Sequence, residues 1–149
     1  MSEVALTGPW SQADVEAYLQ AAVIPARISV VSKSGWPVVV SLWFLYERQT
    51  IYCATRPMSR IAKLLAGQSR VGFEIAGEAP PYRGVRGQGI ASLGVDAGGV
   101  LLTRLIDRYL GKAETPFRNW LLAGADGEVA IAIRPVRFMS WDYRARMGG

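Results

Sequence analysis

The feature that most constrains the fold is the run of residues 37–63, in which two apolar segments and a helical pattern follow one another across short turns. The first segment reads PVVVSLWF and the second TIYCA. β-Branched and aromatic residues separated by so short a turn are typical of paired antiparallel strands. Apolar side chains then recur at helical spacing from Pro57, which suits a first helical position, to Gly67. We therefore predict strand, hairpin, strand and helix in this order.

The remaining segments extend this pattern. Ser11 and Asp14 predict a capping box at the start of a helix that ends near residue 22. Residues 36–46 contain so few polar side chains that we expect one long strand covered on both faces, by the core on one and by a partner or ligand on the other. We also expect Pro135 to interrupt the final strand. Further strands are expected over residues 26–32, 71–75, 83–95 and 128–143, and further helices after Asp96 and Thr115.

These segments predict a mainly β protein of the α+β class. The expected architecture is a split β-barrel of six to seven mostly antiparallel strands, with three to four short helices packed at its openings. No linker or internal repeat divides the 149 residues, and that length suits one core. We therefore expect a single domain over residues 1–149.

Composition limits the chemistry. The chain has no histidine and one cysteine, Cys53. A Ser-His-Asp triad, histidine-ligated zinc or haem and a thiolate metal cage within one chain are thereby excluded, so we expect no metal site and identify no catalytic residue. A bound organic cofactor is the most economical source of reactivity.

The charge balance allows an anionic ligand. Seventeen Lys and Arg face twelve Asp and Glu, which gives a net charge of +5. The arginines are spread along the chain and form no basic tail, so we expect no nucleic-acid partner. We also expect no signal peptide and no membrane segment, because no positive leader precedes an apolar run of sufficient length. The single cysteine is compatible with a cytoplasmic location.

Two neighbouring groups of residues are the main site candidates. Thr55, Ser59, Arg60 and Lys63 place two hydroxyls and two cations at a helix start, which suits a phosphate; the alternative is the solvated face of an amphipathic helix. Val40, Ser41, Leu42 and Trp43 offer an apolar wall with regular main-chain groups for a flat ring, such as a flavin. The alternative for this group is an ordinary core strand.

A glycine-rich segment and an aromatic terminus supply weaker candidates. Gly84, Gly87 and Gly89 allow close approach of a ligand or of another backbone. Their order does not match a dinucleotide fingerprint, and a bent barrel strand is the alternative. The segment 138–144 includes Trp141, which either closes a pocket, forms a dimer seam or belongs to a plain terminal strand.

Taken in order, these pieces resemble the FMN-binding split-barrel family, the pyridoxamine 5'-phosphate oxidase-like proteins. The resemblance covers about residues 26–93, with weaker support from the last strand. Its carriers are Pro37-x-x-x-Ser41-x-Trp43-Phe44, Ile51-Tyr52-x-x-Thr55, Ser59-Arg60-x-x-Lys63, Val71-x-Phe73 and Arg83-Gly84-Val85-x-Gly87-x-Gly89.

The resemblance implies a homodimer with two cofactor sites at the subunit interface. FMN would be held through its phosphate by Thr55, Ser59, Arg60 and Lys63, and its ring would be lined by residues 40–43 and by Ala54. Tyr82, Arg83 and Trp141 are assigned to the side of a small-molecule substrate.

Three departures shift the resemblance within the family. The oxidases themselves have an arginine where this chain has Val40 and a lysine where it has Ile61, and they use a C-terminal histidine on their substrate. The pattern here is closer to the flavin and deazaflavin (F420) reductase branches. Three hypotheses follow: an FMN-dependent or F420-dependent oxidoreductase, a non-catalytic protein that sequesters or senses a flavin, and a basic barrel that binds nucleic acid.

Overall fold

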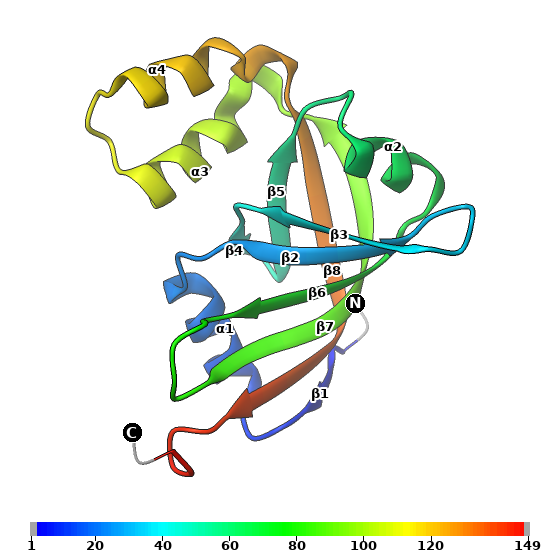
Figure 1. The fold of residues 1–149 in the computed structure, drawn as a ribbon, viewed down its shortest axis with the longest axis vertical. Coiled ribbons are helices and arrows are strands. Elements are labelled where there is room, and N and C mark those ends of the chain that lie inside the picture. Colours follow the sequence, from blue (N-terminus) through cyan, green and yellow to red (C-terminus); the bar gives the residue numbers. More distant parts are fainter. Residues whose placement is uncertain (1–2, 148–149) are drawn as a thin grey trace.

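The computed structural model describes residues 3–147, which form one curled sheet with helices at its ends (Figure 1). The strands are β1 (Ala5–Thr7), β2 (Ala26–Val31), β3 (Pro37–Leu42), β4 (Leu45–Glu47), β5 (Thr50–Thr55), β6 (Arg70–Ala76), β7 (Arg83–Val95) and β8 (Val129–Asp142). The helices are α1 (Gln12–Ala21), α2 (Arg60–Gly67), α3 (Val100–Leu110) and α4 (Pro116–Ala123), with short 3₁₀ turns at Ala97–Gly99 and Ala125–Gly127.

The sheet has the strand order β3-β2-β6-β7-β8-β5-β4, and β1 adds to β8. Every pair is antiparallel except β1 with β8. Because β3 and β4 follow one another in the chain yet occupy the two ends of this order, the sheet curls into a barrel that is split between them. The predicted fold class is confirmed, with two short strands, β1 and β4, beyond the expected elements.

The barrel interior is filled by alternate residues of the central strands. Ile28, Ile51, Ile75, Ile131, Ile133 and Phe138 are fully buried. Helix α1 contributes Val15 and Leu19 from one face to the same core. Ser11 and Asp14 form the predicted capping box at its start.

The single long strand predicted over residues 36–46 is wrong. The chain leaves the sheet at Trp43 and Phe44, so that β3 and β4 are separate strands. Within one chain, Val38, Val40 and Leu42 of β3 pack against the core, whereas Val39 is 64% exposed on the other face. An edge strand alternates between core and surface even when its sequence is apolar throughout.

Two predicted element boundaries are also corrected. Helix α2 begins after Ser59, and not at Pro57, because the Ser59 side chain accepts the Ala62 amide and acts as the N-cap. Strand β8 runs through Pro135 without a break, because the register with β7 shifts between Gln88 and Gly89 and accommodates the proline.

Helices α3 and α4 form a pair that closes one end of the barrel (Figure 1). Asp96 accepts the amides of Leu101 and Leu102 at the start of α3. Helix α3 also carries Arg108, whose guanidinium donates to the carbonyl oxygens of Leu19 and Ala22 at the end of α1. None of the helices described is long and apolar enough to cross a membrane.

Candidate functional site

The hydroxyls at the start of α2 are engaged in capping the helix. Thr55, which is buried at the end of β5, donates to the Ser59 hydroxyl oxygen at 2.8 Å. The same oxygen accepts the Ala62 amide at 3.1 Å. A serine hydroxyl that accepts twice retains its own proton for donation. Ser59 is therefore held in place and able to donate one further hydrogen bond, while Thr55 acts through Ser59.

The cations of α2 lie on a cleft of about 440 Å³ between this helix and the β2–β3 turn. Arg60 and Lys63 line its helix side, and Ser32, Lys33 and Ser34 line its turn side. None of the ion pairs within residues 3–147 involves Lys33, Arg60 or Lys63. Three uncompensated positive charges around one cleft favour an anionic ligand.

Lys33 was not identified by the sequence reasoning. Residues 34–35 were predicted as a turn, but a turn signal does not show which helix the hairpin tip lies against. The sequence did contain one signal: Lys33, one of only three lysines in the chain, lies between two serines. The approach of the hairpin tip to α2 depends on the sheet, in which β2 lies between β3 and β6.

The predicted ring wall is divided among three surfaces. Val40 and Leu42 face the core, and Ser41 is exposed on the outer face of β3. Trp43 stacks on Tyr109 of α3, with ring centroids 5.0 Å apart and planes 9° from parallel. Trp43 and Ala54 both pack against the small cluster formed by Leu102, Ile106 and Ala125.

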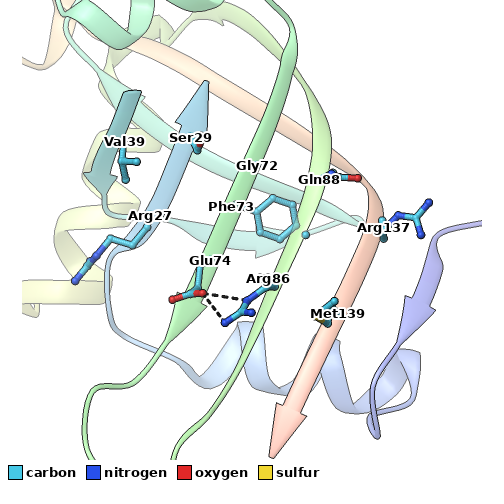
Figure 2. Close-up of a pocket in the computed structure, with 11 residues that line it drawn as sticks. Arg27, Ser29, Val39, Gly72, Phe73, Glu74, Arg86, Gln88, Arg137 and Met139 are labelled. Carbon is cyan, nitrogen blue, oxygen red and sulfur yellow. Dashed lines mark hydrogen bonds and ion pairs between the residues drawn. The ribbon is translucent and has the colours of Figure 1, made fainter. Parts of the chain in front are cut away.

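The outer face of the sheet carries a separate hollow of about 420 Å³ (Figure 2). Cross-strand register aligns Val39, Ser29, Gly72, Gln88 and Arg137 in one row across five strands. Gly72, which has no side chain, leaves the hollow at the centre of this row.

The next row of this face carries most of its charge. Arg86 pairs with Glu74 at 3.0 Å (Figure 2). Arg27 pairs with Glu78 at 3.3 Å. Val39 and Met139 add exposed apolar area at the two sides of the hollow. This is the face on which the sequence analysis expected a ligand or partner to cover β3.

The predicted substrate-side residues lie at the far end of the sheet from α2. Gly84 pairs with Ala76 and with Trp141, whereas Arg70, which follows α2, pairs with Ile90. Strand β6 separates the two ends by about 20 Å at roughly 3.3 Å per residue. Within one chain, therefore, Tyr82, Arg83 and Trp141 are not brought together with Arg60 and Lys63.

The glycines of β7 make room for neighbouring strands. A Cβ at Gly87 would collide with the Arg137 carbonyl oxygen and lie 2.6 Å from Phe73, and one at Gly89 would lie 2.8 Å from Ile133. The predicted alternative of a bent barrel strand accounts for these two positions.

The single cysteine is not poised as a nucleophile. Cys53 is fully buried, and burial raises the pKa of its thiol to about 12. No group of three metal-ligating side chains occurs in the part of the chain that the structure describes.

Glu128, directly before β8, is a buried carboxyl group with 9% of its surface exposed. Burial raises its pKa, the charge of Arg56 opposes this rise, and the charge of Asp96 adds to it. No pattern in the sequence predicted the burial of Glu128.

Comparisons with solved structures identify the fold. No protein-family profile and no curated protein matches the sequence. The conserved hypothetical protein Rv2991 from Mycobacterium tuberculosis superposes with a TM-score of 0.74 and 22% identity, over 91% of this chain and 87% of that one. An F420 reductase gives a TM-score of 0.70 and 22% identity, over 83% and 94%.

A structure from Listeria innocua that carries the name of a pyridoxamine 5'-phosphate oxidase gives a TM-score of 0.63 and 17% identity, over 83% of this chain and 92% of that one. HutZ, the haem storage protein of Vibrio cholerae, gives 0.60 and 16%, over 83% and 89%. The chain thus has the split-barrel fold of the pyridoxamine 5'-phosphate oxidase-like proteins, as the sequence resemblance predicted.

Proposed function

We propose that this split-barrel protein is a homodimeric flavin-dependent oxidoreductase that binds FMN and transfers hydride to or from a small organic substrate. The observation that carries the proposal is the cleft in which Lys33, Arg60 and Lys63 converge. Two proteins of the same fold, an F420 reductase and one named as a pyridoxamine 5'-phosphate oxidase, support a redox role.

The residues at α2 fit a phosphate group. A phosphate dianion needs positive charge and several hydrogen-bond donors. Arg60 offers a planar bidentate donor, Lys33 and Lys63 offer point charges, and the Ser59 hydroxyl retains one proton to donate. These side chains would hold the phosphate of the cofactor, while Thr55 would orient Ser59 from behind.

The outer sheet face is the best surface for the ring of the cofactor. Ser41 and Val39 are exposed there and the hollow of Figure 2 adjoins them. When bound, the flavin would accept and return a hydride. The protein would position the ring through the exposed side of β3, whereas Trp43 would support it indirectly by fixing the chain between β3 and β4 against Tyr109.

The distribution of the predicted residues supports a dimer. The cationic cleft and the Tyr82–Arg83–Trp141 end lie at opposite ends of β6 in one chain. A second copy could pack against the outer sheet face of the first in the opposite orientation. The Tyr82–Arg83–Trp141 end of the second copy would then lie near the cationic cleft of the first. The same contact would cover the exposed side chains of Val39 and Met139.

The number of cations favours F420 as the alternative cofactor. FMN ends in one phosphate, whereas the tail of F420 carries several anionic groups. Three cations from two elements exceed what a single phosphate requires. F420-dependent reduction is therefore the second candidate.

The deciding experiment is titration of the purified protein with FMN and with F420, followed by absorbance and by calorimetry. We expect micromolar or tighter binding of one cofactor at one equivalent per chain, and a dimer by analytical ultracentrifugation. Failure of both cofactors to bind would defeat the proposal.

Turnover with a reductant and a panel of quinones and dyes separates an oxidoreductase from a non-catalytic flavin-binding protein. A salt-dependent shift of oligonucleotides without cofactor binding would instead support the nucleic-acid hypothesis.

A further inference from the structure

A second cleft, of about 500 Å³, lies between α1 and the end of the sheet where β7 begins and β8 ends. One face of α1 contributes Ala17, Tyr18 and Ala21, which the helical repeat places together. Arg83 and Arg144 lie on the sheet side. This cleft is at the opposite end of β6 from the cationic cleft of α2.

The walls of this cleft are aromatic and its floor is made of small residues. The rings of Trp10 and Tyr18 lie 5.0 Å apart and 48° from parallel. Ala17 and Ala21 leave space beside Tyr18 on the helix surface. A volume of this size suits a ligand of one or two fused rings, for which the aromatic and alanine side chains offer apolar contact and the charged residues of the sheet side offer polar contact.

Hydrogen bonds fix the side chains around the cleft. The Trp10 indole donates to Asp142 at 3.1 Å, and its main-chain amide donates to the buried Ser140 hydroxyl at 3.1 Å. Asp142 also accepts two bonds from the Arg144 guanidinium, at 2.6 and 2.9 Å. The walls are thus in place before any ligand arrives.

One cation in the cleft has no ion-pair partner among the described residues. Asp142 pairs with Arg144, and Asp14 accepts the Ser11 amide at the positive end of α1. Arg83 lies with its guanidinium carbon 5.8 Å from the centre of the Tyr18 ring, and no ion pair within residues 3–147 includes it. The four charged side chains of the cleft cancel formally, and the guanidinium of Arg83 is the one left to pair with a ligand, next to an aromatic wall.

We propose that this cleft binds a planar aromatic monocarboxylate, whose ring lies on the alanine floor against Trp10 and Tyr18 and whose carboxylate pairs with Arg83. A bidentate contact between the Arg83 guanidinium and the carboxylate would orient the ligand, and the volume of the cleft limits the size of its ring system. The Asp142–Arg144 pair would exclude dianions, because it adds no net positive charge.

The test is calorimetric titration of the full chain with 2-naphthoate, with neutral 2-naphthamide as the matched probe. We expect saturable binding of naphthoate at one equivalent per chain and at least tenfold weaker binding of the amide. Arg83→Gln should weaken naphthoate binding at least tenfold. Ala17→Leu, at an exposed helical position, should fill the cleft and abolish binding with an unchanged melting temperature.

A control variant locates the effect. Arg48→Gln, on the exposed β4–β5 turn, should bind naphthoate as the unmodified protein does. The proposal is overturned if naphthoate does not bind, if the amide binds equally well, or if binding survives both Arg83→Gln and Ala17→Leu. Loss of binding in the double variant Arg60→Ala, Lys63→Ala, with full binding in Arg83→Gln, would place the ligand in the α2 cleft instead and would also overturn it.

Discussion

The hydroxyl oxygen of Tyr109 lies 3.0 Å from the main-chain nitrogen of Phe44 and 2.8 Å from the carbonyl oxygen of Ile24. Phe44 belongs to the two-residue break between β3 and β4, where the barrel is split and no strand supplies a partner. One phenol on α3 thus satisfies main-chain groups on both sides of the split.

Removal of that hydroxyl should destabilise the fold without loss of apolar packing. Tyr109→Phe leaves the stack on Trp43 intact but leaves the buried amide of Phe44 without its acceptor. We expect the free energy of unfolding to fall by about 1–3 kcal/mol. Urea denaturation checks this, and Tyr143→Phe near the exposed C-terminal end is the control, expected to change stability by less than about 0.5 kcal/mol. Equal stability of the two variants would contradict the role assigned to Tyr109.

A methyl group at Gly87 should be poorly tolerated. It would collide with the Arg137 carbonyl oxygen and with the Phe73 ring, and main-chain atoms in the centre of a sheet cannot move aside cheaply. We expect Gly87→Ala to cost about 2–4 kcal/mol. Gly94→Ala, in the same strand with no heavy atom within 4 Å of its Cβ position, should be neutral or slightly stabilising. Thermal unfolding of the two variants makes the comparison.

Stability should depend on Glu47 at acidic pH. Its bidentate bond to Arg104, at 2.8 Å for both contacts, lowers its pKa from 4.5 to about 2. A carboxylate whose pKa is lowered on folding stabilises the protein above its unfolded pKa and loses this effect as the pH falls. Glu47→Gln should therefore be less stable at pH 7, by at most about 1 kcal/mol for a partly exposed pair, and this difference should shrink as the pH falls from the ordinary carboxyl value toward 2. Glu114→Gln, at an exposed position outside the ion pairs of residues 3–147, is the control variant.

Glu128 should show the opposite dependence. Burial raises the pKa of this carboxyl group in the folded protein, so the folded state is disfavoured as the pH rises from the ordinary carboxyl value through the raised one. Glu128→Gln removes the buried charge. We expect this variant to melt at a higher temperature than the unmodified protein at pH 8 and the difference to vanish near pH 4. A variant that is less stable at pH 8 would indicate that Arg56 compensates the charge fully.

The double variant Arg60→Ala, Lys63→Ala should reduce cofactor affinity about a hundredfold, which corresponds to about 3 kcal/mol for two charge-assisted contacts. Both side chains are exposed, so the melting temperature of the free protein should hardly change. Lys33→Ala alone should weaken cofactor binding less than the double variant does. If the ammonium group of Lys33 contacts the longer anionic tail of F420, this variant should weaken F420 binding more than FMN binding. Unchanged affinity in the double variant would show that the anchor has been assigned wrongly.

The sequence predicted those parts of the fold that depend on local signals. The capping box at Ser11, the helix after Thr115 and the alternation in residues 71–75 each follow from neighbouring residues, and each is present. The end of the long apolar strand at Trp43 was missed because it depends on a distant residue, Tyr109, that satisfies the released main chain.

The candidate site shows the same limit. Helical spacing predicted that Arg60 and Lys63 lie one turn apart at a helix start, and in the structure both side chains line one cleft. Lys33 reaches the same cleft only because the sheet topology places the β2–β3 turn beside α2. The capping role of Thr55 and Ser59 follows only from their hydrogen bonds in the structure. The outward direction of Ser41, by contrast, follows from strand alternation once the core side is known.

Strand β8 is the last strand that the structure describes, and it pairs with β1, β5 and β7. A ribosome must therefore release residues 129–142 as well before the centre of the sheet can be completed. Until then, β5 and β7 have open hydrogen-bonding edges beside apolar side chains, which is the condition in which nascent chains aggregate or recruit chaperones. Truncation by even a dozen residues at the C-terminus should consequently produce an insoluble polypeptide in place of a shortened native protein.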